Sequence, residues 1–147
     1  MISYDKIFSR FLSKLTDFNI ASLSDIELYN LGSEWLHSTA ATIRLRPIFK
    51  TLVLNDEESF VTFELVNSID EYSDENFAIE VFALGMSIGW LQMHVDSILN
   101  VAPMIGGKEE KKLIDNHKSS IERLKTLKIE LKKTMRDYGY LYTVVSR

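Results

Sequence analysis

The stretch DENFAIEVFALGMSIGWLQMHVDSILN, residues 74–100, decides the fold class of this chain. Its apolar residues recur at steps of three and four, which is the period of one helix face. That row consists of Phe77, Val81, Leu84, Ile88, Leu91 and Val95. Further apolar residues widen the row until the middle of the stretch is apolar on nearly every side. The pattern predicts one helix from about Asp74 to about Asn100, at the centre of a small helical bundle.

Gly85 and Gly89 lie four residues apart inside this predicted helix. Each glycine costs roughly 1 kcal/mol of helix stability relative to alanine, so we expect another helix to approach closely at this point. The same spacing occurs in membrane helix dimers, but Gln92, His94 and Asp96 interrupt the apolar run. Since no window reaches about 18 uninterrupted apolar residues, the sequence predicts no membrane span.

Two helices are predicted ahead of this stretch. Ser3 can cap a first helix, which carries an apolar stripe from Tyr4 to Leu15. The segment SDIE, residues 24–27, is a capping box that opens a second helix. That second helix should end before Pro47, because a proline disfavours helical geometry in the residue before it.

A change of period between the second and third helices predicts a β-hairpin at about 52–65. Short β-branched and aromatic runs flank the polar loop Asn55–Ser59. The alternation directs Val61, Phe63 and Leu65 toward the core and the residues between them toward solvent.

The C-terminal part of the chain predicts a long helix followed by a strand-like tail. A loop at 101–107 precedes a helix from about Lys108 to Tyr138, which would reach roughly 45 Å. Gly139 can end that helix, and the alternating residues that follow are typical of an extended segment. The predicted division is therefore a single helical domain at 1–137 and an extended docking segment at 138–147. This segment could pair with the hairpin of its own subunit or add as a strand to another chain.

Charge is unevenly distributed along the chain, whose net charge is −4. No Lys or Arg occurs between Lys50 and Lys108, while that segment holds ten acidic residues. From Lys108 to Asp137 there are ten basic residues and six acidic ones. These regions could be solvated faces, could meet within one subunit, or could join neighbouring subunits head to tail.

No local motif in the sequence indicates catalysis, a metal site or a cofactor. The chain has no cysteine, and its histidines His37, His94 and His117 fall on three different predicted helices. The run at 105–109 lacks the spacing and the hydroxyl residue of a phosphate-binding loop. We therefore expect a protein that is not an enzyme and that carries no metal or cofactor.

Several sequence segments resemble those of small virion proteins of tailed bacteriophages of Gram-positive hosts, namely the head–tail connectors, or adaptors, beneath the portal ring. The segments are SYDKIFSRFL (3–12), WLHS (35–38), LNDEESFVTFEL (54–65), DENFAIEVFALGM (74–86), GGKEEK (106–111) and RDYGY (136–140). The resemblance extends over most of the chain.

The resemblance implies a homo-oligomeric ring of about twelve copies, made in the host cytoplasm and located in the virion. The ring would bind the portal protein and a neck or tail-completion protein, and DNA would pass through it without sequence-specific contact. The C-terminal segment would bind the portal. The acidic residues would line the channel or form a face between rings. The predicted docking residues are Tyr138, Tyr140, Leu141, Tyr142, Val144 and Val145, and the acidic ones are Asp56, Glu57, Glu58, Asp70 and Glu71.

The alternative is a small cytoplasmic helical regulator that binds another protein through its Tyr-rich C-terminus. A connector should be present in purified particles, whereas a regulator should form a defined small complex and be absent from them.

Overall fold

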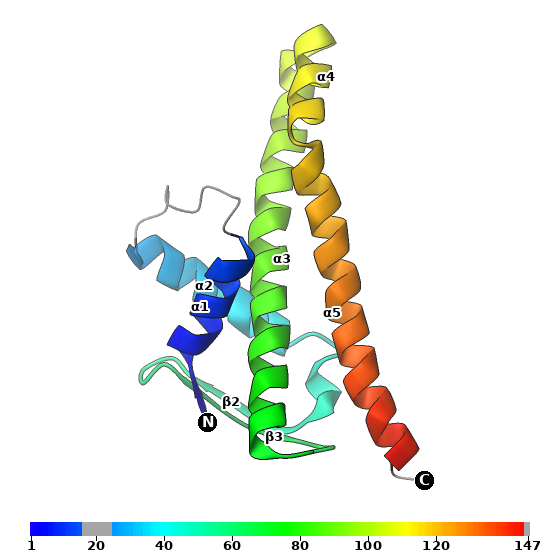
Figure 1. The fold of residues 1–147 in the computed structure, drawn as a ribbon. Helices are drawn as coiled ribbons and strands as arrows, with labels where there is room; N and C mark the ends of the chain where they lie inside the picture. The colour runs from blue at the N-terminus through cyan, green and yellow to red at the C-terminus, as the bar shows by residue number, and fades with distance from the viewer. Residues whose placement is uncertain (16–24, 146–147) are drawn as a thin grey trace.

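The long helix predicted from residues 74–100 forms the central axis of the molecule, as α3 (Glu71–Ile105). The computed structural model describes residues 1–15 and 25–145, and the side chains of Asp25 and of 139–145 lie outside that description. Figure 1 shows the remaining helices arranged around α3 and the small sheet at one end of it. The predicted mainly α fold with a short β-hairpin is confirmed.

α3 is longer than predicted at both ends. Asp70 caps its first turn by accepting a 2.7 Å hydrogen bond from the Ser73 amide. The predicted loop at 101–107 is wrong, because the helix continues through Pro103 and ends only at Ile105. Proline removes one backbone donor but leaves the following turn possible. Gly106, with φ of 72°, then ends the helix.

Two short helices cover one side of α3. α1 (Tyr4–Lys14) begins at the predicted cap Ser3, whose hydroxyl accepts from the Lys6 amide. α2 (Asp25–Ala40) ends well before Pro47, as predicted. Ser24 of the predicted capping box lies outside the described residues.

α2 crosses α3 at the two glycines, which confirms the predicted close approach. A Cβ atom on Gly85 would lie 2.1 Å from Thr39 Oγ1, and one on Gly89 would lie 2.6 Å from Trp35 Cδ1. Neither distance is possible for real atoms, so only glycine permits this separation of the two helices.

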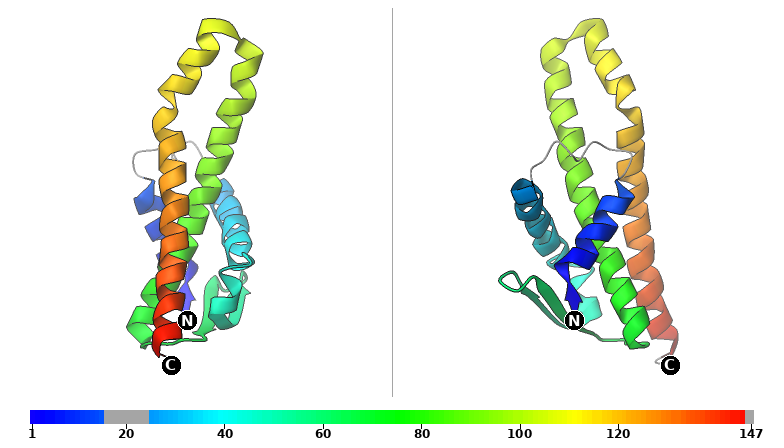
Figure 2. Two further views of the ribbon diagram at one scale, coloured as in Figure 1. Left: turned by 90° about the vertical axis from the view of Figure 1, so that its right-hand side faces the viewer. Right: turned by 60° about the vertical axis from the view of Figure 1, so that its left-hand side comes forward.

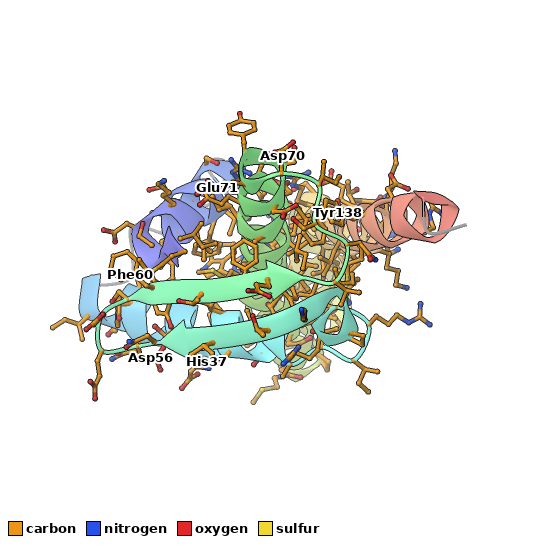
Figure 3. All side chains as sticks on the ribbon, turned by 90° about the horizontal axis from the view of Figure 1, so that it is seen from below. His37, Asp56, Phe60, Asp70, Glu71 and Tyr138 are labelled. Carbon is orange, nitrogen blue, oxygen red and sulfur yellow. The ribbon has the colours of Figure 1, made fainter. Side chains whose placement is uncertain are left out.

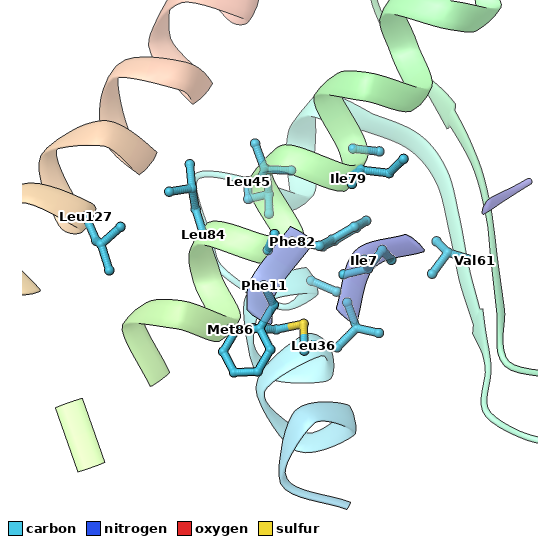
Figure 4. Close-up of a cluster of buried hydrophobic side chains, with 14 of the residues drawn as sticks. Ile7, Phe11, Leu36, Leu45, Val61, Ile79, Phe82, Leu84, Met86 and Leu127 are labelled. Carbon is cyan, nitrogen blue, oxygen red and sulfur yellow. The ribbon is translucent and has the colours of Figure 1, made fainter. Parts of the chain in front are cut away.

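The core fills the space between α1, α2, α3, α5 and the sheet, as Figure 4 shows. Its largest fully buried side chains include Phe11, Leu36, Phe82 and Met86. α3 is long and apolar enough to cross a membrane by composition, with a mean hydropathy of 1.2 over its most apolar window. However, 56% of that window is buried inside the molecule, as expected of a core helix.

The hairpin forms where predicted, from β2 (Phe49–Asn55) and β3 (Phe60–Leu65), after a short 3₁₀ turn at Arg46–Ile48. The residues predicted to face the core are buried or half-buried, and the residues between them are exposed. No pattern in the sequence indicated β1 (Ile2–Ser3), which pairs antiparallel with β3 to complete a sheet of order β1-β3-β2. Two residues are too few to show a strand period.

The single helix predicted from Lys108 to Tyr138 is divided in two. α4 (Gly107–Asn116) follows α3 directly, His117 interrupts the helix, and α5 (Lys118–Val145) runs back along α3. Figure 2 shows the last turns of α3 extending beyond α1 and α2, with α4 and α5 beside them. We call this projecting part, formed by residues 93–124, the arm.

The predicted extended segment at 138–147 is wrong up to Val145, because α5 is helical throughout its described length. Gly139 weakens the helix but does not end it. A strand needs a partner to satisfy its backbone groups, whereas a helix that already exists gains one hydrogen bond for each residue added. The boundary between the two predicted parts of the chain therefore falls inside a helix.

Candidate interaction surfaces

Asp56, predicted to lie on an acidic face, is bonded to residues of its own subunit. The Tyr4 hydroxyl donates to Asp56 Oδ1 at 2.5 Å, and His37 Nε2 lies 2.8 and 2.9 Å from the two carboxylate oxygens. The hydrogen bond from Tyr4, followed by that from His37, holds the pKa of Asp56 below its ordinary value. Burial, reinforced by Asp56, raises the pKa of Tyr4.

The rest of the hairpin loop is also fixed in one conformation. The Tyr29 hydroxyl lies 2.9 Å from Ser59 Oγ and donates to the Asp56 carbonyl at 3.3 Å. Asn55 Oδ1 accepts from the Glu58 amide at 3.1 Å, and Ser59 adopts a φ of 59°. The loop is therefore tied to α1 and α2, which a polar loop sequence alone does not predict.

Glu57 and Glu58 differ from Asp56 in that their side chains take no part in these bonds. Both residues are exposed, and neither carboxylate forms an ion pair or hydrogen bond within the described part of the chain. The structure thus presents two unpaired negative charges on a rigid loop.

The five predicted acidic residues do not form one cluster. Asp56 lies beside the hairpin turn, whereas Asp70 and Glu71 lie at the start of α3 on the other side of the hairpin (Figure 3). β3 separates the two groups, and its six residues span roughly 20 Å. Glu71 is exposed and Asp70 caps α3, so the loop and the helix start are separate acidic sites.

Tyr138, predicted as a docking residue, packs within its own subunit. Its ring stacks on Phe77 with centroids 4.1 Å apart, and its hydroxyl donates to Asp74 Oδ1 at 2.5 Å. Ser68 Oγ and the Ile69 amide also donate to the Asp74 carboxylate, at 2.5 and 3.0 Å. This contact joins the end of the helical bundle to the first turn of α3. Its sequence signal is the spacing of Ile121, Leu124, Leu131, Met135 and Tyr138, which recur at helical steps along one side of α5.

The environment of Asp74 stabilises its charged form. Burial raises the pKa of this carboxyl, but the hydrogen bonds from Ser68, Tyr138 and the backbone outweigh it and leave the pKa below its ordinary value. Burial is the main cause of the raised pKa of Tyr138, and Asp74 adds to it.

The other five predicted docking residues can be placed only by their backbone. Tyr140, Leu141, Tyr142, Val144 and Val145 belong to the last turns of α5, and their side chains lie outside the described residues. Their role in docking stays a prediction.

α5 carries a basic face on the side away from α3. Lys125, Lys132 and Lys133 are exposed and form no ion pair with any described residue. Ile129 lies among them with 66% of its surface exposed. Lys128 differs from them because it donates to Gln92 Oε1 on α3 at 3.0 Å.

The end of the arm exposes apolar side chains. Met104 is 84% exposed, and Val101 and Ile105 are about half exposed. Near the base of the arm, the His94 ring stacks on Trp90 and meets the His117 ring at a centroid distance of 5.6 Å. Burial and the neighbouring His117 lower the pKa of His94.

No group of three or more potential metal ligands occurs among the described residues. No protein-family model, no curated protein and no solved structure matches the chain.

Proposed function

We propose that this protein is a structural assembly subunit, a head–tail connector of a tailed bacteriophage. In this proposal copies of the chain form a ring, which binds the portal protein on one side and a neck or tail-completion protein on the other. The ring extends the channel through which DNA leaves the head. Its work is mechanical, since it joins particles rather than transforming a substrate.

The observation that carries the proposal is the separation of charge on a rigid subunit. Ten acidic residues and no basic ones fall between Lys50 and Lys108, whereas α5 exposes lysines that have no partner among the described residues. A ring built by head-to-tail contacts needs two different surfaces that complement each other. Opposite charge also guides such surfaces together and disfavours wrong pairings.

The arm supports the same proposal. It projects beyond α1 and α2 (Figure 2) and exposes Met104, Val101 and Ile105 near its end. Apolar side chains grouped at a projecting end are typical of surfaces that bind another protein. The arm is thus suited to reach a neighbouring component of the particle.

The partners in this proposal are those that the resemblance to phage connectors implies. Because the backbone is helical through Val145, the C-terminus would not bind the portal as an extended strand. Portal binding by the last residues of the chain would use a helix end instead.

The test is to look for the protein in purified particles and to mix it with the portal protein encoded in the same genome. We expect mass spectrometry to find the chain in tailed particles at several copies per portal ring. We also expect the purified chain to sediment with assembled portal rings and not with unassembled portal subunits.

Absence from particles, together with a small stoichiometric complex with a host or phage protein, would contradict the proposal. That outcome would favour the alternative of a cytoplasmic regulator.

A further inference from the structure

We propose that the acidic hairpin loop of one copy, through Glu57 and Glu58, binds the basic face of α5 of the next copy, through Lys125, Lys132 and Lys133. This inference rests on the proposed ring and names the surfaces that would build it. The occupant of each surface is therefore a second copy of this chain.

The two surfaces lie on opposite sides of the subunit. Figure 1 shows the turn between β2 and β3 on the left and α5 on the right, and Figure 3 shows the same separation from below. Glu57 and Glu58 therefore cannot reach the α5 lysines of their own chain. A contact between such surfaces is heterologous and repeats from copy to copy, closing into a ring or continuing as a filament.

Each surface carries charge that its own subunit leaves unpaired. Neither the two loop carboxylates nor the three α5 lysines form an ion pair within the described residues, although Asp56 and Lys128 beside them are bonded. Lys128 lies three residues after Lys125 and four before Lys132, so like charges repel along this side of the helix, and an acidic partner would relieve that repulsion. The charges on the two surfaces are opposite, so the surfaces are complementary.

The loop is organised before any partner binds. Tyr4 and His37 hold Asp56, and Tyr29 holds Ser59, so Glu57 and Glu58 project from a fixed backbone. A loop that is already ordered loses less conformational entropy on binding than a mobile one.

The basic face of α5 is a continuous stripe of exposed side chains that a protruding loop could contact. Lys125, Ile129 and Lys132 follow steps of four and three, so they line one side of the helix, with Lys133 beside them. Ile129, at 66% exposure, offers apolar contact amid the charges. Apolar contact rimmed by opposite charges is the usual composition of a specific interface.

The first test is cross-linking of the unchanged full-length chain. Light and ¹⁵N-labelled protein are mixed at low ionic strength, and a carbodiimide joins carboxylates to amines that touch. We expect peptides that link light Glu57 or Glu58 to heavy Lys125, Lys132 or Lys133. A chain that stays monomeric at high concentration, or links between copies only at other residues, would overturn the inference.

The second test reverses charge on one surface at a time. We expect Lys132→Glu with Lys133→Glu, or Glu57→Lys with Glu58→Lys, to weaken self-association by about tenfold or more, measured by sedimentation velocity. A matched control, Lys111→Glu with Lys112→Glu on exposed turns of α4, should associate like the unchanged chain. Circular dichroism checks that each variant is folded.

Restored pairing makes the test specific. An equal mixture of the two reversed variants, and a single chain carrying all four substitutions, should both regain self-association. Failure of both to recover would overturn the inference, as would a reversal of α5 that abolishes binding of a DNA duplex and leaves self-association unchanged.

The outcome is separable from that of the proposed function. A chain that associates through these surfaces but is absent from particles would keep this inference and remove the connector proposal. A chain found beneath the portal but joined through other surfaces would keep the connector proposal and remove this inference.

Discussion

Two glycines determine how closely the helices of this protein pack. Gly85 and Gly89 lie on the side of α3 that faces α2, where Thr39 and Trp35 occupy the space that a Cβ atom would need. The loss of helix stability at each glycine is offset by the contact area that the close approach allows. Small residues at a helix crossing thus act through the neighbouring helix more than through their own.

The substitution Gly85→Ala should therefore destabilise the protein although alanine is the better helix former. A new Cβ would lie 2.1 Å from Thr39 Oγ1, and relieving such overpacking typically costs about 1–3 kcal/mol. Urea unfolding followed by circular dichroism measures the change. The control Ser97→Ala, at an exposed position of the same helix, should leave stability unchanged or slightly higher. Equal stability of Gly85→Ala and the unchanged chain would contradict the packing described for α2.

At the scale of elements, α5 packs against α3 as far as Tyr138 and continues as a helix beyond it. Tyr138 joins the helix to Phe77 and Asp74, whereas the residues after it add backbone turns beyond that contact. Tyr138 therefore marks the last residue of α5 whose packing against α3 the structure describes.

Two truncations that differ by one residue test this division. Removal of 139–147 should leave the thermal unfolding midpoint nearly unchanged, because Tyr138 is retained. Removal of 138–147 also deletes the stacked ring and its hydrogen bond, and should destabilise the protein by about 1–3 kcal/mol. Tyr138→Phe in the full chain separates the hydroxyl from the ring and should cost about 1 kcal/mol.

Equal stability of the two truncated chains would show that the contact of Tyr138 with Asp74 contributes nothing in solution. If the shorter truncation, which lacks 139–147, keeps its stability but no longer sediments with portal rings, the docking role predicted for the last residues gains support.

At the scale of the whole molecule, two aspartates tie distant parts of the chain together and make stability depend on pH. Asp56 joins the hairpin loop to α1 and α2, and Asp74 joins the chain before α3 to α5. Both have a pKa below the ordinary value in the folded protein. The folded state therefore binds fewer protons than the unfolded state in the acidic range.

It follows that these two aspartates should make the free energy of unfolding fall as pH drops below about 5, through the unfolded and then the folded pKa of each group. His94, whose pKa is lowered in the folded protein, should add a decrease that begins near pH 6.5. Asp74→Asn should flatten this dependence and lower stability at pH 7. Asp56 should contribute less to this pH dependence of stability, because its side chain is 55% exposed and solvent screens its charge. Asp115→Asn, at an exposed position of α4, serves as the control, and the same slope in Asp74→Asn as in the unchanged chain would contradict this assignment.

Periodic segments of the sequence predict the corresponding elements well. The apolar rows predict α1 and α3, the segment at 24–27 predicts the start of α2, and the alternation at 60–65 predicts the face of β3 that is buried. Gly85 and Gly89 predict a close helix crossing, and charge placement shows an acidic middle segment and a basic C-terminal one. These properties depend on neighbours along the chain, so a single sequence is enough to reveal them.

Other features exist only because distant residues meet. Asp56 reads as a free surface acid in the sequence, but in the fold it is bonded to Tyr4 and His37 and holds the hairpin loop. Tyr138 is predicted to dock a partner, but in the fold it packs on Phe77 and bonds to Asp74. The strand-like residues after Gly139 continue α5, because β-propensity needs a neighbouring strand and helix extension does not. The sequence by itself determined the periodic elements and the placement of charge; the tertiary structure alone decided where the last helices begin and end and which side chains are free, because partners far apart in the chain satisfy a polar group only once the chain has folded.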